Sequence, residues 1–245
     1  MYQNTRPLNK TQNLKYSQLT TYTFASDQNF CPIFLQELPQ LVREYFICFP
    51  NNQTDLPHAL FGFEKGVNKY VAPDGTWQAD YIPAYIRRYP FILAKQGGRD
   101  EHTLAADMDA PHFSQDSGDP LFTPDGQPTS LLQDKINLLK GIESQRQATQ
   151  KAVQHIDQAG LFKMEQMTVK SGDQAVSSIG GLRMIDEDKL AQSGLTPGPA
   201  LQLIYAHLLS KANLQYGVLA GKKPDSGISV DQQGEMFINW DLFKY

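Results

Sequence analysis

The sequence has few cysteines, no long apolar run and no excess of basic residues, and each shortage excludes a class of protein. Its 245 residues include only two cysteines, Cys31 and Cys48, which are too few for a disulfide framework and lack CxxC spacing. No apolar run reaches the roughly 18 residues that a membrane helix needs, so we predict no membrane span. With 22 Lys and Arg against 26 Asp and Glu, the net charge of −4 leaves no basic field, and we predict no nucleic-acid partner.

Motifs that mark common enzyme classes are also missing. The chain contains no GxSxG, no P-loop and no GxGxxG. Residues 1–16 are polar and lack the apolar core of a secretory signal, which favours a cytoplasmic location. We therefore predict no cofactor and no metal, and the composition indicates an ordinary globular chain.

The densest pattern runs from Tyr81 to Phe91, with the sequence Tyr-Ile-Pro-Ala-Tyr-Ile-Arg-Arg-Tyr-Pro-Phe. Pro83 suits the first turn of a helix, where a missing N–H costs nothing, and Pro90 cannot continue one. The spacing therefore predicts a short helix over 83–88 that feeds a strand from Phe91. Because adjacent helical residues point about 100° apart, we expect one of the two arginines to turn inward and the other to face solvent.

The remaining patterns predict an α+β fold, in which an antiparallel sheet of short strands packs against two principal helices. Residues 1–20 are polar and are expected to be loosely packed. Helices are predicted over 32–45, 130–159, 186–190 and 197–216. Strands are predicted over 21–24, 46–49, 58–63, 69–72, 91–94, 102–106, 168–170, 175–179 and 182–185, with a further edge strand at 236–240.

This pattern divides the chain into three parts. Residues 1–25 form a polar N-terminal arm, and residues 217–245 form a C-terminal tail. The α+β domain between them, 26–216, is expected to be strand-rich over 26–115 and helix-rich over 116–216.

The helix over 130–159 is the longest predicted element, with Ser130 as its expected cap and Gly160 as its expected stop. Arg146 and Thr149 interrupt its apolar face. Two interpretations stay open: the middle of the helix overhangs solvent, or it borders a cavity.

Several of these segments occur together in one known family. They are Trp77, Tyr81-Ile-Pro-Ala84, Arg87-Arg-Tyr-Pro-Phe91, Asp107, Pro120-Leu-Phe122, Asp125-Gly126, the segment from Gly181 to Leu190, and Leu203 to Ser210 with Asn213. In this combination, over about residues 30–216, the sequence resembles the SapC family of bacterial proteins. The first 25 residues and the tail after Gly221 lie outside the resemblance.

The resemblance implies a link to bacterial surface layers, from which the family takes its name. It also implies a functional link to TonB-dependent receptors, flavin-dependent tryptophan halogenases and cupin-like proteins, beside which members are often encoded. It supplies no catalytic residues.

The predicted ligand site is an arginine–aromatic cluster, in which a guanidinium clamps a carboxylate or phosphate and tyrosines stack on it. Its residues are Arg87, Arg88, Tyr81, Tyr85, Tyr89 and Trp77. The alternative is structural: an arginine bonds helix carbonyls or pairs with a buried acid such as Asp80 or Asp107.

A rival hypothesis makes the chain an enzyme or a metal protein. Asp107, Asp109 and His112 form Asp-x-Asp-x-x-His, whose oxygen and nitrogen atoms suit a divalent metal or acid–base chemistry. His207 is a second candidate base. We name no catalytic residue, and we expect an accessory protein that binds a peptide, a protein or a small anionic ligand near Arg87 and Arg88; a structural role in a surface layer is the third possibility.

Overall fold

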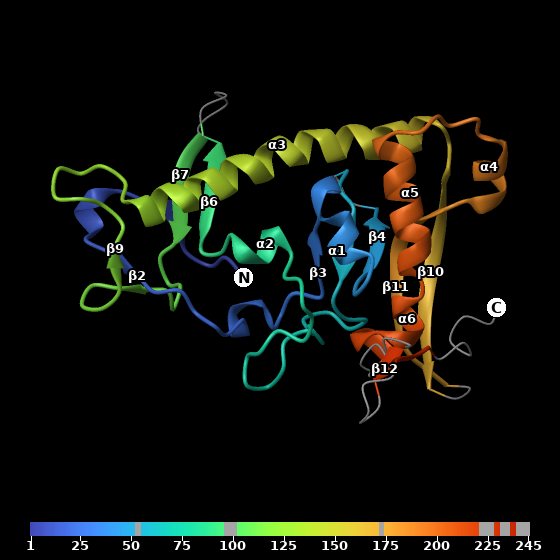
Figure 1. Cartoon of the computed structure of the whole chain (residues 1–245), viewed down its shortest axis with the longest axis horizontal. Coiled ribbons are helices and arrows are strands. Elements are labelled where there is room, and N and C mark those ends of the chain that lie inside the picture. The colour runs from blue at the N-terminus through green and yellow to red at the C-terminus, as the bar shows by residue number, and fades with distance from the viewer. Residues whose placement is uncertain (52–54, 96–101, 172–173, 221–227, 231–235, 239–245) are drawn as a thin grey trace.

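The computed structural model of the chain describes residues 1–51, 55–95, 102–171, 174–220, 228–230 and 236–238. The α+β prediction is confirmed, because antiparallel sheets pack with two long helices, α3 (Ser130–Gln158) and α5 (Pro199–Ser210). The described strands form four sheets instead of the single sheet that the sequence predicted. Figure 1 shows α3 running along one side of the elongated molecule, from the end that carries β2 and β9, past β6 and β7, to α5 and β10 at the other end.

The remaining elements are short. The helices are η1 (Lys10–Gln12), η2 (Thr23–Ala25), η3 (Leu35–Glu37), α1 (Leu38–Leu41), α2 (Ala84–Arg87), α4 (Glu187–Gln192), α6 (Asn213–Tyr216) and η4 (Val218–Ala220). The strands are β1 (Thr5–Pro7), β2 (Lys15–Tyr16), β3 (Phe30–Pro32), β4 (Phe46–Pro50), β5 (His58–Leu60), β6 (Phe91–Lys95), β7 (His102–Asp107), β8 (Phe113–Ser114), β9 (Asp119–Pro120), β10 (Phe162–Ser171), β11 (Gln174–Ile185), β12 (Ile228–Val230) and β13 (Met236–Ile238).

The largest sheet has the strand order β10-β11-β4-β5-β3 and carries the main core. The predicted hairpin is longer than expected, because β10 and β11 pair from Phe162↔Ile185 to Ser171↔Gln174. Helix α5 packs on β4, where the side chain of Ser210 accepts a hydrogen bond of 3.0 Å from the backbone N–H of Ile47. The half of the domain predicted to be helix-rich thus also holds the two longest strands.

The N-terminal segment is built into the fold, so the prediction of loose packing is wrong. Strand β1 pairs with β7 through Thr5↔Asp107 and completes the sheet β1-β7-β6. Strand β2 lies between β8 and β9, and the side chain of Tyr16 is buried there. These polar residues are held by backbone pairing, which hydrophobic periodicity does not reveal.

Three further predictions fail for local reasons. The alternating segment 21–24 is not a strand, since residues 23–25 form a 3₁₀ turn. The helix expected over 32–45 is reduced to η3 and α1, because Phe34 is extended and Pro39 fits only at the start of α1. Residues 69–72 contribute only an isolated bridge between Val71 and Trp77.

The long helices begin and end almost where predicted. Thr129, one residue before the expected Ser130, caps α3 by accepting the N–H of Leu132 at 3.4 Å. Gly160 follows the last turn with φ = 67°, a conformation that glycine adopts without strain. The helix expected over 197–216 is interrupted after Ser210 and continues as α6. The predicted edge strand at 236–240 is present as β13, which pairs with β12, while residues 239–240 lie outside the described residues.

Helix α3 joins two cores. Its N-terminal half packs into a cluster with Tyr16 and Phe91, and its C-terminal half contributes Val153 and Ile156 to the main core. A small apolar cluster of Phe34, Leu56, Ala84 and Ile142 lies at its middle. In the part of the chain that the structure describes, no helix has both the length and the apolar character to cross a membrane.

Candidate functional site

Helix α2 directs its two arginines to different tyrosines. The carbonyl of Pro83 accepts the N–H of Arg87 at 3.1 Å, so the turn starts at this proline as the sequence predicted. Arg87 is exposed, with its Cζ 5.4 Å from the centroid of the Tyr81 ring. Arg88 is half-buried, with its Cζ 3.8 Å from the centroid of the Tyr85 ring. One arginine turns inward and the other faces solvent, as expected.

Arg88 lies between two aromatic rings. Its Cζ is also 5.6 Å from the centroid of the Tyr2 ring, so it joins α2 to the N-terminal segment. Its Nε is buried and makes no hydrogen bond with the described residues. The cation–π contacts indicate a packing role for this side chain.

The buried carboxylate of Glu37 organises the residues around Arg87. Glu37 Oε1 accepts hydrogen bonds from the hydroxyl of Tyr81 at 2.9 Å and from the N–H of Ala84 at 2.7 Å. Its Oε2 accepts the N–H of Phe34 at 3.1 Å. Burial raises the pKa of Glu37, although these three donors and the charge of Arg87 oppose the increase. The tyrosine held in this way accepts a hydrogen bond of 3.1 Å from Arg87 Nη2.

A cavity of about 190 Å³, here called the Arg87 cavity, opens beside this arginine. It is lined by Gln18, Leu19, Tyr22, Phe24, Ile86, Arg87, Tyr89, His112, Lys135 and Leu138. None of these lining residues is acidic. Among the described residues, neither Arg87 nor Lys135 lies within ion-pair distance of a carboxylate. The cavity therefore presents two cationic groups that an anion could neutralise.

Lys135 reaches this cavity from α3. Its Nζ donates to Gln18 Oε1 at 3.0 Å and lies 5.0 Å from the centroid of the Tyr16 ring. Burial lowers the pKa of Lys135, and the exposed carboxylate of Asp134 only partly offsets that effect. A bound anion would favour the charged form, so this site gains electrostatic stabilisation from an anionic ligand.

His112 forms the inner wall of the Arg87 cavity and is buried. Its ring stacks on Tyr16 at a centroid distance of 5.6 Å and meets Phe24 and Tyr89 edge-on, both at 5.4 Å. Its Nδ1 is buried and has no hydrogen-bond partner among the described residues. Burial, helped by the charge of Lys135, lowers the pKa of His112 to about 4, so the ring is neutral at pH 7.

A second cavity of about 290 Å³, here called the glutamine cavity, adjoins the first along α3. The two share Arg87 and Leu138. The other residues that line the glutamine cavity are Phe34, Gln36, Glu37, Gln40, Tyr81, Ala84, Gly141, Ile142 and Gln145. The middle of α3 thus borders a cavity, about one turn before Arg146 and Thr149, the polar positions that had raised this possibility. Thr149 is buried, so its part of the face does not overhang solvent.

The other aromatic residues of the predicted site have packing partners. Trp77 lies in the main core, and its indole N–H donates to the hydroxyl of Tyr45 at 2.7 Å. Tyr89 donates its hydroxyl to Asp107 Oδ2 at 3.0 Å. Whether Tyr85, Tyr89 and Trp77 contact a ligand stays a prediction.

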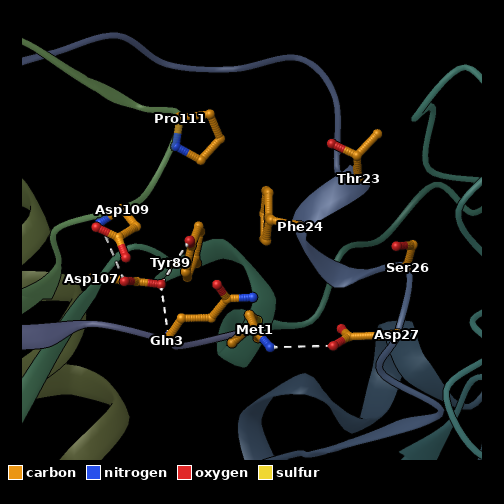
Figure 2. Close-up of a pocket in the computed structure, with 10 residues that line it drawn as sticks. All are labelled: Met1, Gln3, Thr23, Phe24, Ser26, Asp27, Tyr89, Asp107, Asp109 and Pro111. Atoms are coloured by element: carbon orange, nitrogen blue, oxygen red, sulfur yellow. Dashed lines mark hydrogen bonds and ion pairs between the residues drawn. The ribbon is translucent and has the colours of Figure 1, made fainter.

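Asp107 and Asp109 line a different cavity of about 380 Å³ (Figure 2). The carboxylate of Asp107 accepts the N–H groups of Gln3 and Asn4 at 3.0 and 2.9 Å, beside its bond from Tyr89. Burial pushes the pKa of Asp107 upward, but these hydrogen bonds outweigh it and hold the pKa below its usual value. Asp107 is therefore an ionised group that anchors the N-terminal segment to the end of β7.

The predicted triad of Asp107, Asp109 and His112 does not converge. Figure 2 shows Tyr89 and Phe24 at the cavity of the two aspartates, and the same two rings line the Arg87 cavity with His112. These rings stack with their centroids 4.4 Å apart, and the acids and the imidazole line different cavities that share the two rings. Within the described residues, no group of three His, Cys, Asp or Glu side chains is placed to hold a metal ion.

His207 lies in the main core and lines none of the cavities described above. Its side chain is buried, its Nδ1 lies 2.7 Å from the carbonyl oxygen of Ile47, and Phe46 and Phe49 pack against it. Burial lowers the pKa of His207 to about 4. The geometry identifies it as a core residue that ties α5 to β4, and the prediction of a base beside the arginines is wrong.

A model of the SapC family matches residues 8–216. The chain belongs to the SapC family. This match begins at residue 8, whereas the resemblance seen in the sequence began at about residue 30. It therefore includes β2 and most of the predicted N-terminal arm, residues 1–25. Neither the curated proteins nor the solved structures contain a match. For this SapC-family chain, the cavities themselves are therefore the evidence on ligand binding.

Three residues of the site were not predicted from the sequence. Lys135 and Glu37 are separated from Arg87 by long stretches of chain, and Gln18 lies 117 positions from the lysine it contacts. A signal was available for Glu37, an acid within an otherwise apolar helical pattern. For Lys135 and Gln18 only the tertiary structure supplies the connection.

Proposed function

We propose that this SapC-family protein is a binding protein that holds a carboxylate or similar small anionic group in the Arg87 cavity. The observation that carries the proposal is the pairing of Arg87 with Lys135 in a cavity whose lining contains no acid. Arg87 is oriented by the hydroxyl of Tyr81 and by the carbonyl of Ile82, at 3.1 and 2.9 Å. Because Lys135 is half-buried and the exposed carboxylate of Asp134 offsets its burial only in part, an anion improves its electrostatic environment.

The two orienting bonds leave Arg87 with further N–H groups for a ligand, since a guanidinium carries five donors. Lys135 contributes a point charge from the opposite element. A single carboxylate that bridges the two elements fits this arrangement, and it makes Arg88 dispensable for binding.

Acetate and thermal unfolding test the proposal. At equal ionic strength, acetate at about ten times its Kd should stabilise the protein by about 1.4 kcal/mol relative to chloride, which raises Tm by about 3–6 °C. The variants Arg87→Gln and Lys135→Gln should lose this increase. Lys140→Gln, on an exposed position of the same helix, removes the same charge and should retain it. An equal increase in all four proteins would refute the proposal.

The accessory role beside TonB-dependent receptors, tryptophan halogenases or cupin-like proteins rests on the family resemblance, and so does the alternative role in a surface layer. The cytoplasmic location rests on the sequence of residues 1–16. Fractionation of cells that express the native protein tests the location, and recovery in the surface fraction would favour the surface-layer role.

A further inference from the structure

The glutamine cavity continues the Arg87 cavity along one stripe of α3. Lys135, Leu138, Gly141, Ile142 and Gln145 recur at helical spacing and line one cavity or the other. The ten steps from Lys135 to Gln145, at about 1.5 Å each, make this stripe about 15 Å long. An extended peptide rises about 3.3 Å per residue, so the stripe accommodates four to five residues.

The glutamine cavity offers what a peptide backbone needs. The side-chain amides of Gln36, Gln40 and Gln145 line it, and none has a hydrogen-bond partner among the described residues. Each amide carries both donors and an acceptor, which suits the alternating N–H and C=O groups of an extended chain. Phe34 and Ile142 supply an apolar wall for the side chains between those groups.

Gly141 leaves the glutamine cavity open on the side of α3. Glycine inside a long helix is unfavourable, and packing does not require it here, because a Cβ at position 141 would meet no atom within 4 Å. The residue is exposed and lines the glutamine cavity. A side chain much larger than alanine at this position would therefore extend into the glutamine cavity.

We infer that the ligand is a short extended peptide segment, whose carboxylate sits between Arg87 and Lys135 and whose preceding residues lie against Gly141 in the glutamine cavity. This inference rests on the proposed function, since it uses the same anion site. The carboxylate comes either from a C-terminus or from an acidic side chain, and both present the same two oxygens to Arg87.

Fluorescence anisotropy tests the inference with an N-terminally labelled pentapeptide of alanine and leucine. Three forms separate the sources of the carboxylate: the free C-terminus, its amide, and an amidated peptide that ends in glutamate. The free or the glutamate form should bind at least tenfold more tightly than the plain amide. The preferred form then shows whether a terminus or a side chain is recognised.

Gly141→Leu fills the cavity without contacting the anion site. It should weaken peptide binding at least tenfold while the acetate-dependent increase in Tm persists, and Gly141→Ala should bind close to the wild-type level. Unchanged peptide affinity in Gly141→Leu would overturn the inference, as would acetate stabilisation with no peptide binding in the wild type. If acetate also fails to stabilise the protein, the proposed function fails with it.

Discussion

At the level of single residues, Asp107 shows how one side chain holds a segment that looked unstructured. It is 1% exposed, and its two oxygens accept hydrogen bonds from Gln3, Asn4, Tyr89 and the backbone of Asp109. An amide in the same place can accept on one side only. The remaining donors would then face an NH₂ group and lose their partner.

Asp107→Asn should therefore lower the free energy of unfolding by about 2–3 kcal/mol. Tyr89→Phe removes a single donor and should cost about 1 kcal/mol, which makes it the matched control. Urea denaturation monitored by circular dichroism measures both. Equal losses in the two variants would contradict the role assigned to the carboxylate.

At the level of elements, a helix or strand could be predicted where its signal lies within its own stretch of sequence. Helix α3 and the β10–β11 hairpin were predicted because their periodicity or turn sequence lies within the element. Residues 69–72 read as a strand from composition, yet only the bridge from Val71 to Trp77 forms there. Pairing partners, which decide strands, are not encoded locally.

The residues of the candidate site also differ in whether a local sequence signal predicted them. Arg87 and Tyr81 were found because six positions separate them and prolines fix the backbone around them. The carboxylate that orients Tyr81 lies 44 positions away, and the lysine that completes the cavity comes from another element. Sequence spacing predicted an arginine–aromatic cluster but could not show which cavity it faces.

Gly141 allows a prediction about α3 alone. Because alanine loses less conformational freedom than glycine in a helix and a Cβ at 141 meets no atom, Gly141→Ala should raise the free energy of unfolding by about 0.5–1 kcal/mol. Gly160→Ala is the control, since φ = 67° there disfavours a side chain and should make the variant less stable by about 1 kcal/mol. No stabilisation by Gly141→Ala would contradict the gain expected at position 141. Stabilisation by Gly160→Ala would contradict the backbone strain expected at position 160.

At the level of the whole molecule, the cavities lie where the two cores meet. Helix α3 contributes Leu132 and Leu139 to one core and Val153 to the other. Between these positions, the glutamine cavity is lined by Leu138, Gly141, Ile142 and Gln145. Aromatic and apolar residues on both sides fix the walls. The site is thus a consequence of two packed regions that share one helix.

Three buried histidines should make the stability of the folded protein depend on pH. Burial lowers the pKa of His58, His112 and His207 to about 4 in the folded protein, while an exposed histidine titrates near 6.5. Between these values the unfolded chain binds more protons than the native one, so stability falls as the pH decreases. Each histidine contributes a slope on the order of 1.4 kcal/mol per pH unit in this window.

Three such slopes together approach about 4 kcal/mol per pH unit, a large part of the 5–15 kcal/mol that ordinarily separates native and unfolded states. We therefore expect the urea midpoint to change little between about pH 7 and 8 and to fall steeply between about pH 6.5 and 4. His207→Gln should be less stable than the wild type at pH 7.5, because it disturbs the bond to Ile47, but its stability should fall less steeply with acid. Parallel pH profiles for the two proteins would mean that His207 binds its proton equally well in the folded and the unfolded chain, which would contradict a pKa lowered by burial.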